Sequence, residues 1–161
     1  MQVTFQGAPL TLEGNQVKVG DVAPDFTVVG NDLSPIKFSD IKGKKILVAV
    51  PSLDTPVCDM EVRKFNQEAS KLNDVTVCTI SMDLPFAQAR WCGNAGVEKV
   101  ITASDYKDRE FSKNYGLYIK ELGLVSRAVI VVDEAGKVTY TEYLSEITNE
   151  PNYEGALAAV K

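Results

Sequence analysis

One segment near the centre of the chain limits the possible folds more than any other. Residues 45–50 form a nearly continuous apolar run, which predicts a strand buried on both faces. Thr55 and Pro56 come shortly after it and are typical of a helix start, because Thr55 can cap the helix and Pro56 suits its first position. The apolar residues that follow are spaced as one helical stripe, Cys58, Val62, Phe65, Ala69 and Leu72. A buried strand that leads directly into an amphipathic helix is typical of an α/β layered fold.

The rest of the sequence continues this alternation of strands and helices. Further strands are predicted at residues 74–81, 99–102, 127–133 and 138–144. Further helices are predicted at residues 85–92, where Gly93 and Gly96 end the pattern, at 108–115, and after Glu150-Pro151 through Val160. The last two strands are separated by a polar segment with a glycine, residues 134–137, which is typical of a hairpin turn.

The chain starts with a different pattern. Residues 2–5 and 9–12 alternate apolar and polar side chains around Gly7-Ala8-Pro9, which predicts a β-hairpin, and a short strand is predicted at residues 25–29. The complete order predicts a thioredoxin-like sandwich, in which a mixed central sheet is flanked by helices. We expect residues 1–161 to form a single domain, with the hairpin of residues 1–15 as an extension.

The composition narrows the chemistry that such a fold can support. The chain contains no histidine, so it cannot hold a Ser-His-Asp triad, a Cys-His pair or a His-based zinc site. A strong nucleophile is then most simply one of the three cysteines, because a stabilised thiolate needs no imidazole. The net charge of −5 argues against a nucleic acid or an anionic membrane as a partner, since both attract basic surfaces.

The sequence also indicates where the protein works. The first residues lack the basic start and apolar stretch of a signal peptide, and the longest aliphatic runs are too short to span a bilayer. Three cysteines are an odd number and are too sparse for a small secreted disulfide scaffold. We therefore expect a cytoplasmic protein whose cysteines are free, catalytic or redox-active.

Cys58 lies where the predicted fold favours a reactive thiolate. It comes three residues after Thr55, in the first helical turn, where free backbone N–H groups and the helix dipole stabilise a negative charge. The preceding strand also brings the sulfur to the carboxyl edge of the sheet, where open α/β sheets bind ligands. Position alone leaves another interpretation open, because Cys58 also continues the apolar stripe and could be a packed core residue.

The residues around Cys58 favour the reactive interpretation. The string PSLDTPVC at residues 51–58 resembles the peroxiredoxin active-site signature Pro-x-x-x-Thr/Ser-x-x-Cys. The string SMDLPFAQARWCG at residues 81–93 is similar to the second-cysteine segment of the thiol peroxidase subfamily of the peroxiredoxins. Residues 63–66, 127–133 and 146–153 are similar to that subfamily as well, so the resemblance covers nearly the whole chain.

This resemblance implies a set of roles. Cys58 matches the peroxidatic cysteine, which attacks a peroxide oxygen, and Cys92 matches the resolving cysteine of an intrasubunit disulfide. Thr55 and Pro51 match residues of the peroxide pocket, and Arg127 matches the arginine that stabilises the thiolate and the peroxide oxygens. Without the resemblance, Arg127 could also be a surface charge at a strand end. The subfamily implies reduction of hydrogen peroxide and alkyl hydroperoxides, recycling by thioredoxin, a homodimer, and no metal or organic cofactor.

The chemistry also requires a second thiol. Attack on a peroxide turns a thiolate into a sulfenic acid, which a second thiol can convert into a disulfide. Cys92 is the better candidate because Cys78 lies in the middle of a predicted buried strand, although Cys92 could itself be a packed residue and spacing gives no pairing. A disulfide requires Cα atoms within about 7 Å, so we expect local unwinding around Cys58 and Cys92 on oxidation.

Two other functions could use the same thiols. A general thiol–disulfide oxidoreductase is expected to carry a Cys-x-x-Cys motif, which this sequence lacks. A non-enzymatic redox sensor or binding module would be oxidised once and would then signal to a partner. Catalytic turnover of peroxide with a reductant separates the enzyme from both alternatives.

Overall fold

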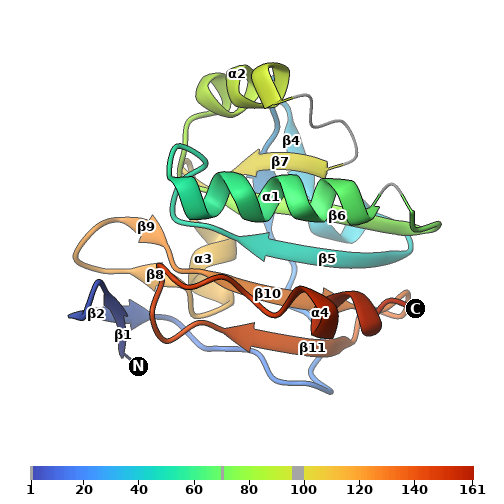
Figure 1. The fold of residues 1–161 in the computed structure, drawn as a ribbon. Helices are drawn as coiled ribbons and strands as arrows, with labels where there is room; N and C mark the ends of the chain where they lie inside the picture. Colours follow the sequence, from blue (N-terminus) through green and yellow to red (C-terminus); the bar gives the residue numbers. More distant parts are fainter. Residues whose placement is uncertain (1, 70, 96–99) are drawn as a thin grey trace.

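The computed structural model describes residues 2–69, 71–95 and 100–161. Across these residues, seven strands form a central mixed sheet, which runs from edge to edge as β11 (Val138–Tyr143), β10 (Ala128–Val132), β5 (Lys44–Ala49), β6 (Val75–Ser81), β7 (Val100–Ser104), β3 (Thr27–Val29) and β4 (Pro35–Lys37). A smaller sheet stands at one side of it (Figure 1) and joins β1 (Gln2–Phe5), β2 (Ala8–Glu13), β8 (Tyr118–Ile119) and β9 (Leu124–Val125). None of the helices in the described ranges is long and apolar enough to cross a membrane.

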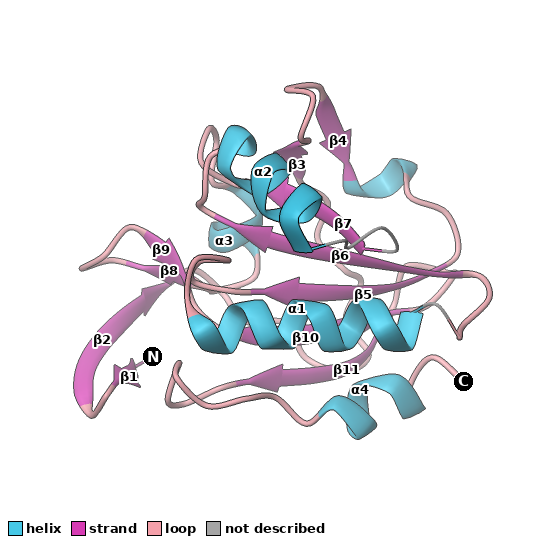
Figure 2. Cartoon of the chain, turned by 45° about the horizontal axis from the view of Figure 1, so that its top comes forward, coloured by secondary structure: helices cyan, strands magenta, loops and turns pink. Residues whose placement is uncertain are grey.

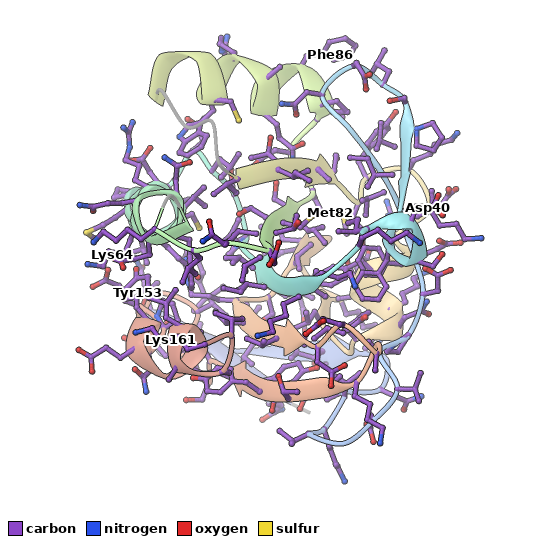
Figure 3. The ribbon with its side chains drawn as sticks, turned by 90° about the vertical axis from the view of Figure 1, so that its right-hand side faces the viewer. Asp40, Lys64, Met82, Phe86, Tyr153 and Lys161 are labelled. Carbon is purple, nitrogen blue, oxygen red and sulfur yellow. The ribbon has the colours of Figure 1, made fainter. Side chains whose placement is uncertain are left out.

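Helices cover both faces of the central sheet (Figure 2). They are α1 (Pro56–Ala69), α2 (Pro85–Ala95), α3 (Glu110–Asn114) and α4 (Tyr153–Ala158), and a 3-10 turn, η1, spans Phe38–Asp40. The helices α1 and α4 share one apolar cluster, in which the ring centres of Phe65 and Tyr153 lie 5.3 Å apart. Figure 3 labels Tyr153 where α4 meets α1. Phe111 of α3 belongs to the cluster on the opposite face. The predicted α/β sandwich with a mixed sheet and flanking helices is therefore confirmed.

The strand β5 shows why its sequence constrains the fold so strongly. Ile46 and Val48 pack into the cluster beneath α1, whereas Leu47 and Ala49 pack into the opposite cluster. All four side chains are at most 1 % exposed. A strand with neighbours on both faces has no solvent side, so its sequence is continuously apolar instead of alternating.

Several predicted boundaries need correction. The N-terminal hairpin turns at Gln6 and Gly7, both with positive φ, while Ala8 and Pro9 already belong to β2. Two consecutive residues with positive φ form the turn type that matches the twist of a hairpin. The helix α2 passes through Gly93 and continues to Ala95, so Gly93 does not end it. The predictions at Gly96 and Lys99 lie outside the described residues.

Three short strands were not predicted from the sequence. The strand β4 has three residues, and β8 and β9 have two each. The strand β8 pairs with β2, which is distant in the chain, whereas β4 pairs with the nearby β3 and β9 with the nearby β8. These segments contain too few residues for a hydrophobic period to be recognised. The longer elements lie within a few residues of their predicted bounds.

The sheet register brings distant segments to one edge. The strand β5 runs parallel to β6, so the carboxyl ends of both strands lie together. The strand β10 runs antiparallel to β5, and Ala128 pairs with Ala49. Arg127 therefore stands beside Val50, at the edge where the chain leaves β5 and approaches α1.

Candidate active site

The sequence motif of residues 51–58 spans the loop between β5 and α1 and the first turn of α1. Pro51 is buried, and the Val50 N–H just before it donates to the Ile80 carbonyl at 3.1 Å, which fixes the start of the segment to β6. Thr55 directly precedes α1, and its carbonyl accepts the Asp59 N–H at 2.9 Å, as expected for the residue at a helix start. The Thr55 hydroxyl donates to the Ser52 carbonyl at 2.9 Å. That hydrogen bond closes the loop.

Cys58 lies in the first turn of α1 with no exposed surface. The Arg127 guanidinium reaches it from the neighbouring strand end, and Nη2 donates to the sulfur at 3.0 Å. The same guanidinium donates through Nη1 to the Glu61 carboxylate and through Nε to the Ile147 carbonyl at 2.8 Å. Each of its three nitrogens thus has a partner, so Arg127 is held rigidly with one N–H aimed at the sulfur. The interpretation of Arg127 as a surface charge is wrong, because its side chain is 2 % exposed.

Glu61 is a site residue that the sequence reasoning missed. It lies three residues after Cys58, on the same face of α1, and is fully buried. Burial raises the pKa of Glu61 to about 7, and the neighbouring positive charge of Arg127 only partly opposes that rise. The sequence did contain a signal for Glu61. A glutamate that lies three residues after Cys58, beside an apolar helical stripe, requires a buried cation as its partner. The arginine before the apolar segment 128–132 provides that cation.

Asp83 is a second residue that the sequence reasoning missed. Its carboxylate accepts the Ser52 hydroxyl and the Leu53 N–H, both at 2.7 Å, and the Ser81 hydroxyl at 2.8 Å. These three hydrogen bonds tie the loop before α1 to the end of β6. The carboxylate thereby positions the backbone of the motif around Thr55.

A depression of about 300 Å³ lies beside this loop. It is lined by Leu53, Asp54, Thr55, Pro56, Asp59 and Trp91. Cys58 does not line the depression, but Thr55 and Pro56 do, and these two residues begin the helical turn that contains the sulfur. The depression therefore gives a small solute a place to approach the first turn of α1.

Cys92 lies on α2 and is partly buried. Its sulfur is 3.2 Å from the Thr102 hydroxyl, which donates to the Asn31 side chain at 3.1 Å. Thr102 belongs to β7, whereas Arg127 directly precedes β10, and β5 and β6 lie between these two strands. Three strand spacings amount to about 14 Å. The structure therefore brings Cys58 and Arg127 together and holds Cys92 apart, with all three cysteines as free thiols.

Cys78 lies inside β6 and packs in the apolar cluster on the face opposite α1. It is 1 % exposed. Burial raises the pKa of the Cys78 thiol to about 12, because no charge compensates for the loss of water. The prediction that Cys78 is a core residue agrees with this environment.

The sequence matches the model of one protein family, described as Redoxin, over residues 18–157. That range includes Cys58, Cys92 and Arg127.

The chain belongs to the Redoxin family.

Similar proteins agree with this membership along the full length of the chain. A thiol peroxidase of Bacillus subtilis (strain 168) is 57% identical over 99% of this chain and 96% of its own length. A thiol peroxidase of Clostridium acetobutylicum is 53% identical over 100% of this chain and 98% of its own length. The predicted resemblance of this Redoxin chain to the thiol peroxidase subfamily is therefore confirmed.

A solved structure is similar in three dimensions as well. A peroxiredoxin-like protein from Aquifex aeolicus superimposes on this Redoxin chain with a TM-score of 0.93 at 41% sequence identity. The match covers 99% of this chain and 95% of that protein. The likeness includes the N-terminal hairpin, which the family model does not cover.

Proposed function

We propose that this chain reduces hydroperoxides, with Cys58 as the attacking thiolate and Cys92 as the resolving thiol. The observation that carries the proposal is the hydrogen bond of 3.0 Å from Arg127 Nη2 to Cys58 Sγ in the first turn of α1. A guanidinium N–H and a helix N-terminus both favour a thiolate over a thiol. Full-length relatives that carry the name thiol peroxidase support the same class, an oxidoreductase that acts on peroxides.

In the first step, the Cys58 thiolate attacks the terminal oxygen of ROOH. An S–O bond forms and the O–O bond breaks, so the sulfur is oxidised by two electrons to a sulfenic acid. The leaving alkoxide takes up a proton and departs as ROH. Arg127 is placed to stabilise the negative charge as it moves from sulfur to oxygen. We propose that Thr55, which lines the depression, and the buried Pro51, which does not line it, shape the peroxide pocket beside the sulfur.

In the second step, the Cys92 thiolate attacks the oxidised sulfur of Cys58. An S–S bond forms, the S–O bond breaks, and hydroxide takes up a proton to leave as water. The two sulfurs contact groups that lie on opposite sides of β5 and β6, so we expect the helical turns that carry them to unwind before the bond forms.

The finer assignments rest on the resemblance to the thiol peroxidase subfamily. We propose that the dithiol of a thioredoxin reduces the Cys58–Cys92 disulfide by thiol–disulfide exchange. We also propose hydrogen peroxide and alkyl hydroperoxides as substrates, a homodimer as the assembly, and the cytoplasm as the location. The reducing cytoplasm suits an enzyme whose thiols must be regenerated.

A coupled assay tests this function. Peroxide reduction is followed with thioredoxin, its reductase and NADPH for the wild type and for Cys58→Ser, Cys92→Ser and Cys78→Ala. We expect Cys58→Ser to be inactive. We expect Cys92→Ser to lose thioredoxin-linked turnover and still to reduce one equivalent of peroxide. Cys78→Ala is the matched control, because it removes a buried thiol from the opposite cluster.

The outcomes separate the possible functions. Full activity of Cys58→Ser would exclude the proposed chemistry. A wild type that consumes a single equivalent of peroxide, and does not turn over with any dithiol reductant, would indicate a redox sensor. The relatives named thiol peroxidase do not favour that outcome.

A further inference from the structure

The two helices that carry the cysteines are joined by a cluster of three side chains. The Trp91 indole N–H donates to Asp59 Oδ1 at 2.7 Å, and Arg63 Nε donates to Asp59 Oδ2 at 2.9 Å. The Arg63 guanidinium also lies over the Trp91 ring, 5.7 Å from its centre. Both oxygens of the Asp59 carboxylate therefore accept a hydrogen bond, one from α2 and one from α1.

Two residues of this cluster are the sequence neighbours of the two cysteines. Asp59 directly follows Cys58, and Trp91 directly precedes Cys92. The hydrogen bond between them therefore connects the two turns that have to rearrange. A cavity of about 180 Å³ lies beside the cluster, between α1 and α2. The side chains of the cluster bridge the two helices next to this cavity and keep some exposed surface.

Disulfide formation cannot leave this contact intact. If Cys58 leaves the Arg127 pocket, the first turn of α1 unwinds and carries Asp59 with it. If Cys92 leaves Thr102, the end of α2 moves and carries Trp91. In either case the carboxylate and the indole separate, so the hydrogen bond is made in the folded, reduced arrangement and is lost before the sulfurs meet.

We propose that Asp59, Arg63 and Trp91 form a latch that holds both cysteine-bearing turns folded until Cys58 has reacted with peroxide. This inference rests on the proposed function of Cys58 and Cys92. The three side chains are positioning residues, because they act on the sulfurs through the helices that carry them. The latch sets the division between two fates of the sulfenic acid, which are disulfide formation and further oxidation by a second peroxide.

The two chemical steps respond differently when the latch is weakened. Attack on peroxide needs the folded site, and a site that is mostly folded stays mostly folded when one hydrogen bond is lost. Disulfide formation needs the unwound state, whose population rises by the factor that the bond contributed. For a hydrogen bond to a charged group that factor is about tenfold.

Trp91→Phe tests the latch while keeping an aromatic ring packed against the apolar cluster beneath α1. In single-turnover experiments we expect the disulfide to form about tenfold faster, while the second-order rate of Cys58 oxidation, measured with Cys92→Ser as background, changes by less than about twofold. The peroxide concentration that inactivates the enzyme during turnover should rise by a similar factor. Glu68→Gln is the control, because it removes ion pairs to Lys64 and Lys71 that do not reach α2.

A double-mutant cycle with Asp59→Asn distinguishes a shared contact from general loosening. If the bond from Trp91 to Asp59 is the latch, the double variant forms the disulfide no faster than the faster single variant. Trp91 is also the single tryptophan of the chain, so its emission reports on the latch directly. In the wild type, the emission should change with the rate of disulfide formation and not with the faster peroxide step.

The outcomes that overturn the latch differ from those that overturn the function. Independent, multiplying effects of the two variants, or an unchanged disulfide rate in a Trp91→Phe protein that keeps the wild-type melting temperature, would exclude the latch while turnover stays intact. If Trp91→Phe does not fold, the rate of disulfide formation in Asp59→Asn and the tryptophan emission of the wild type test the latch in the same way. Activity of Cys58→Ser would overturn the proposed function itself.

Discussion

Cys58 and Cys78 are buried to the same extent and have opposite chemical environments. Their exposed fractions are 0 % and 1 %. Cys78 lies in the middle of β6 among apolar side chains, and burial alone raises the pKa of its thiol to about 12. Cys58 lies at the start of α1, where Arg127 and Glu61 are buried with it. Equal depth of burial is therefore compatible with opposite environments, and the polar groups buried with a thiol determine how well its thiolate is stabilised.

The largest expected effect comes from removing the group that distinguishes Cys58 most. In Arg127→Lys the charge is kept, but the three-way guanidinium contact with Cys58, Glu61 and Ile147 is lost. We expect the second-order rate of Cys58 oxidation to fall by about a hundredfold or more, as for the loss of a transition-state donor. Stopped-flow measurement with hydrogen peroxide checks this.

The control for this variant is Arg109→Lys, because Arg109 is an exposed arginine that lies against Tyr118, away from the sulfur. It should keep the wild-type rate. If folded Arg127→Lys reacted within about threefold of the wild type, the helix start alone would suffice to activate Cys58.

A smaller effect is expected from Glu61→Gln, which keeps the shape of the side chain and removes its charge. We expect Cys58 oxidation to slow by about tenfold above pH 7, because Arg127 loses the charge-assisted bond that orients it. The rate is measured against pH for both proteins. Equal rates at all pH values would show that the Ile147 carbonyl alone orients the arginine.

The same variant tests the pH dependence of stability. Burial raises the folded pKa of Glu61 to about 7 from 4.5, so the folded protein holds this proton at pH values where the unfolded chain has released it. The resulting stability is fully present below pH 4.5 and is lost as the pH rises through about 7. Relative to Glu61→Gln, the free energy of unfolding of the wild type should therefore fall across this window, by on the order of 2 kcal/mol. Denaturant titrations at both ends of the window measure it.

The smallest effect on activity is expected from Cys78→Ala. Peroxidase turnover should stay within about twofold of the wild type, and the free energy of unfolding should fall by about 1 kcal/mol through the lost packing. In the native protein, iodoacetamide should leave Cys78 unmodified, which mass spectrometry of the digested protein can establish. Rapid alkylation of Cys78 would show that its cluster opens readily and would remove the contrast with Cys58.

The order of the long elements along the chain could be predicted because each segment spans enough residues for its hydrophobic period to be recognised. The apolar run of β5 and the stripe through Cys58, Val62 and Phe65 each agree with the structure. The end of α2 was placed too early because a glycine within a helix costs only about 1 kcal/mol relative to alanine, and α2 continues through the exposed Gly93. The pairing of β8 with β2 joins segments that are distant in the chain, and β4 has only three residues, so local patterns predict neither strand.

For the candidate site, the sequence identified the cysteines and Arg127 but not the residues that hold them. Glu61 and Asp83 are acidic residues whose partners become neighbours only when β5, β6 and β10 form the sheet. Spacing along one chain does not contain that information. The catalytic roles of Cys58, Cys92, Arg127, Thr55 and Pro51 stay predictions. The unwinding around the two cysteines and the single-domain assignment stay predictions as well.

The three-way contact of Arg127 has a practical consequence for handling the protein. Ile147, which accepts from Arg127 through its carbonyl, donates its own N–H to Thr4 at 2.9 Å, so β1 supports the segment that holds the arginine. A purification tag or fluorophore fused ahead of β1 is therefore attached to the scaffold of the candidate active site. Exposed Lys161, after α4 and well apart from that hairpin (Figure 1), is the better attachment point for kinetic work.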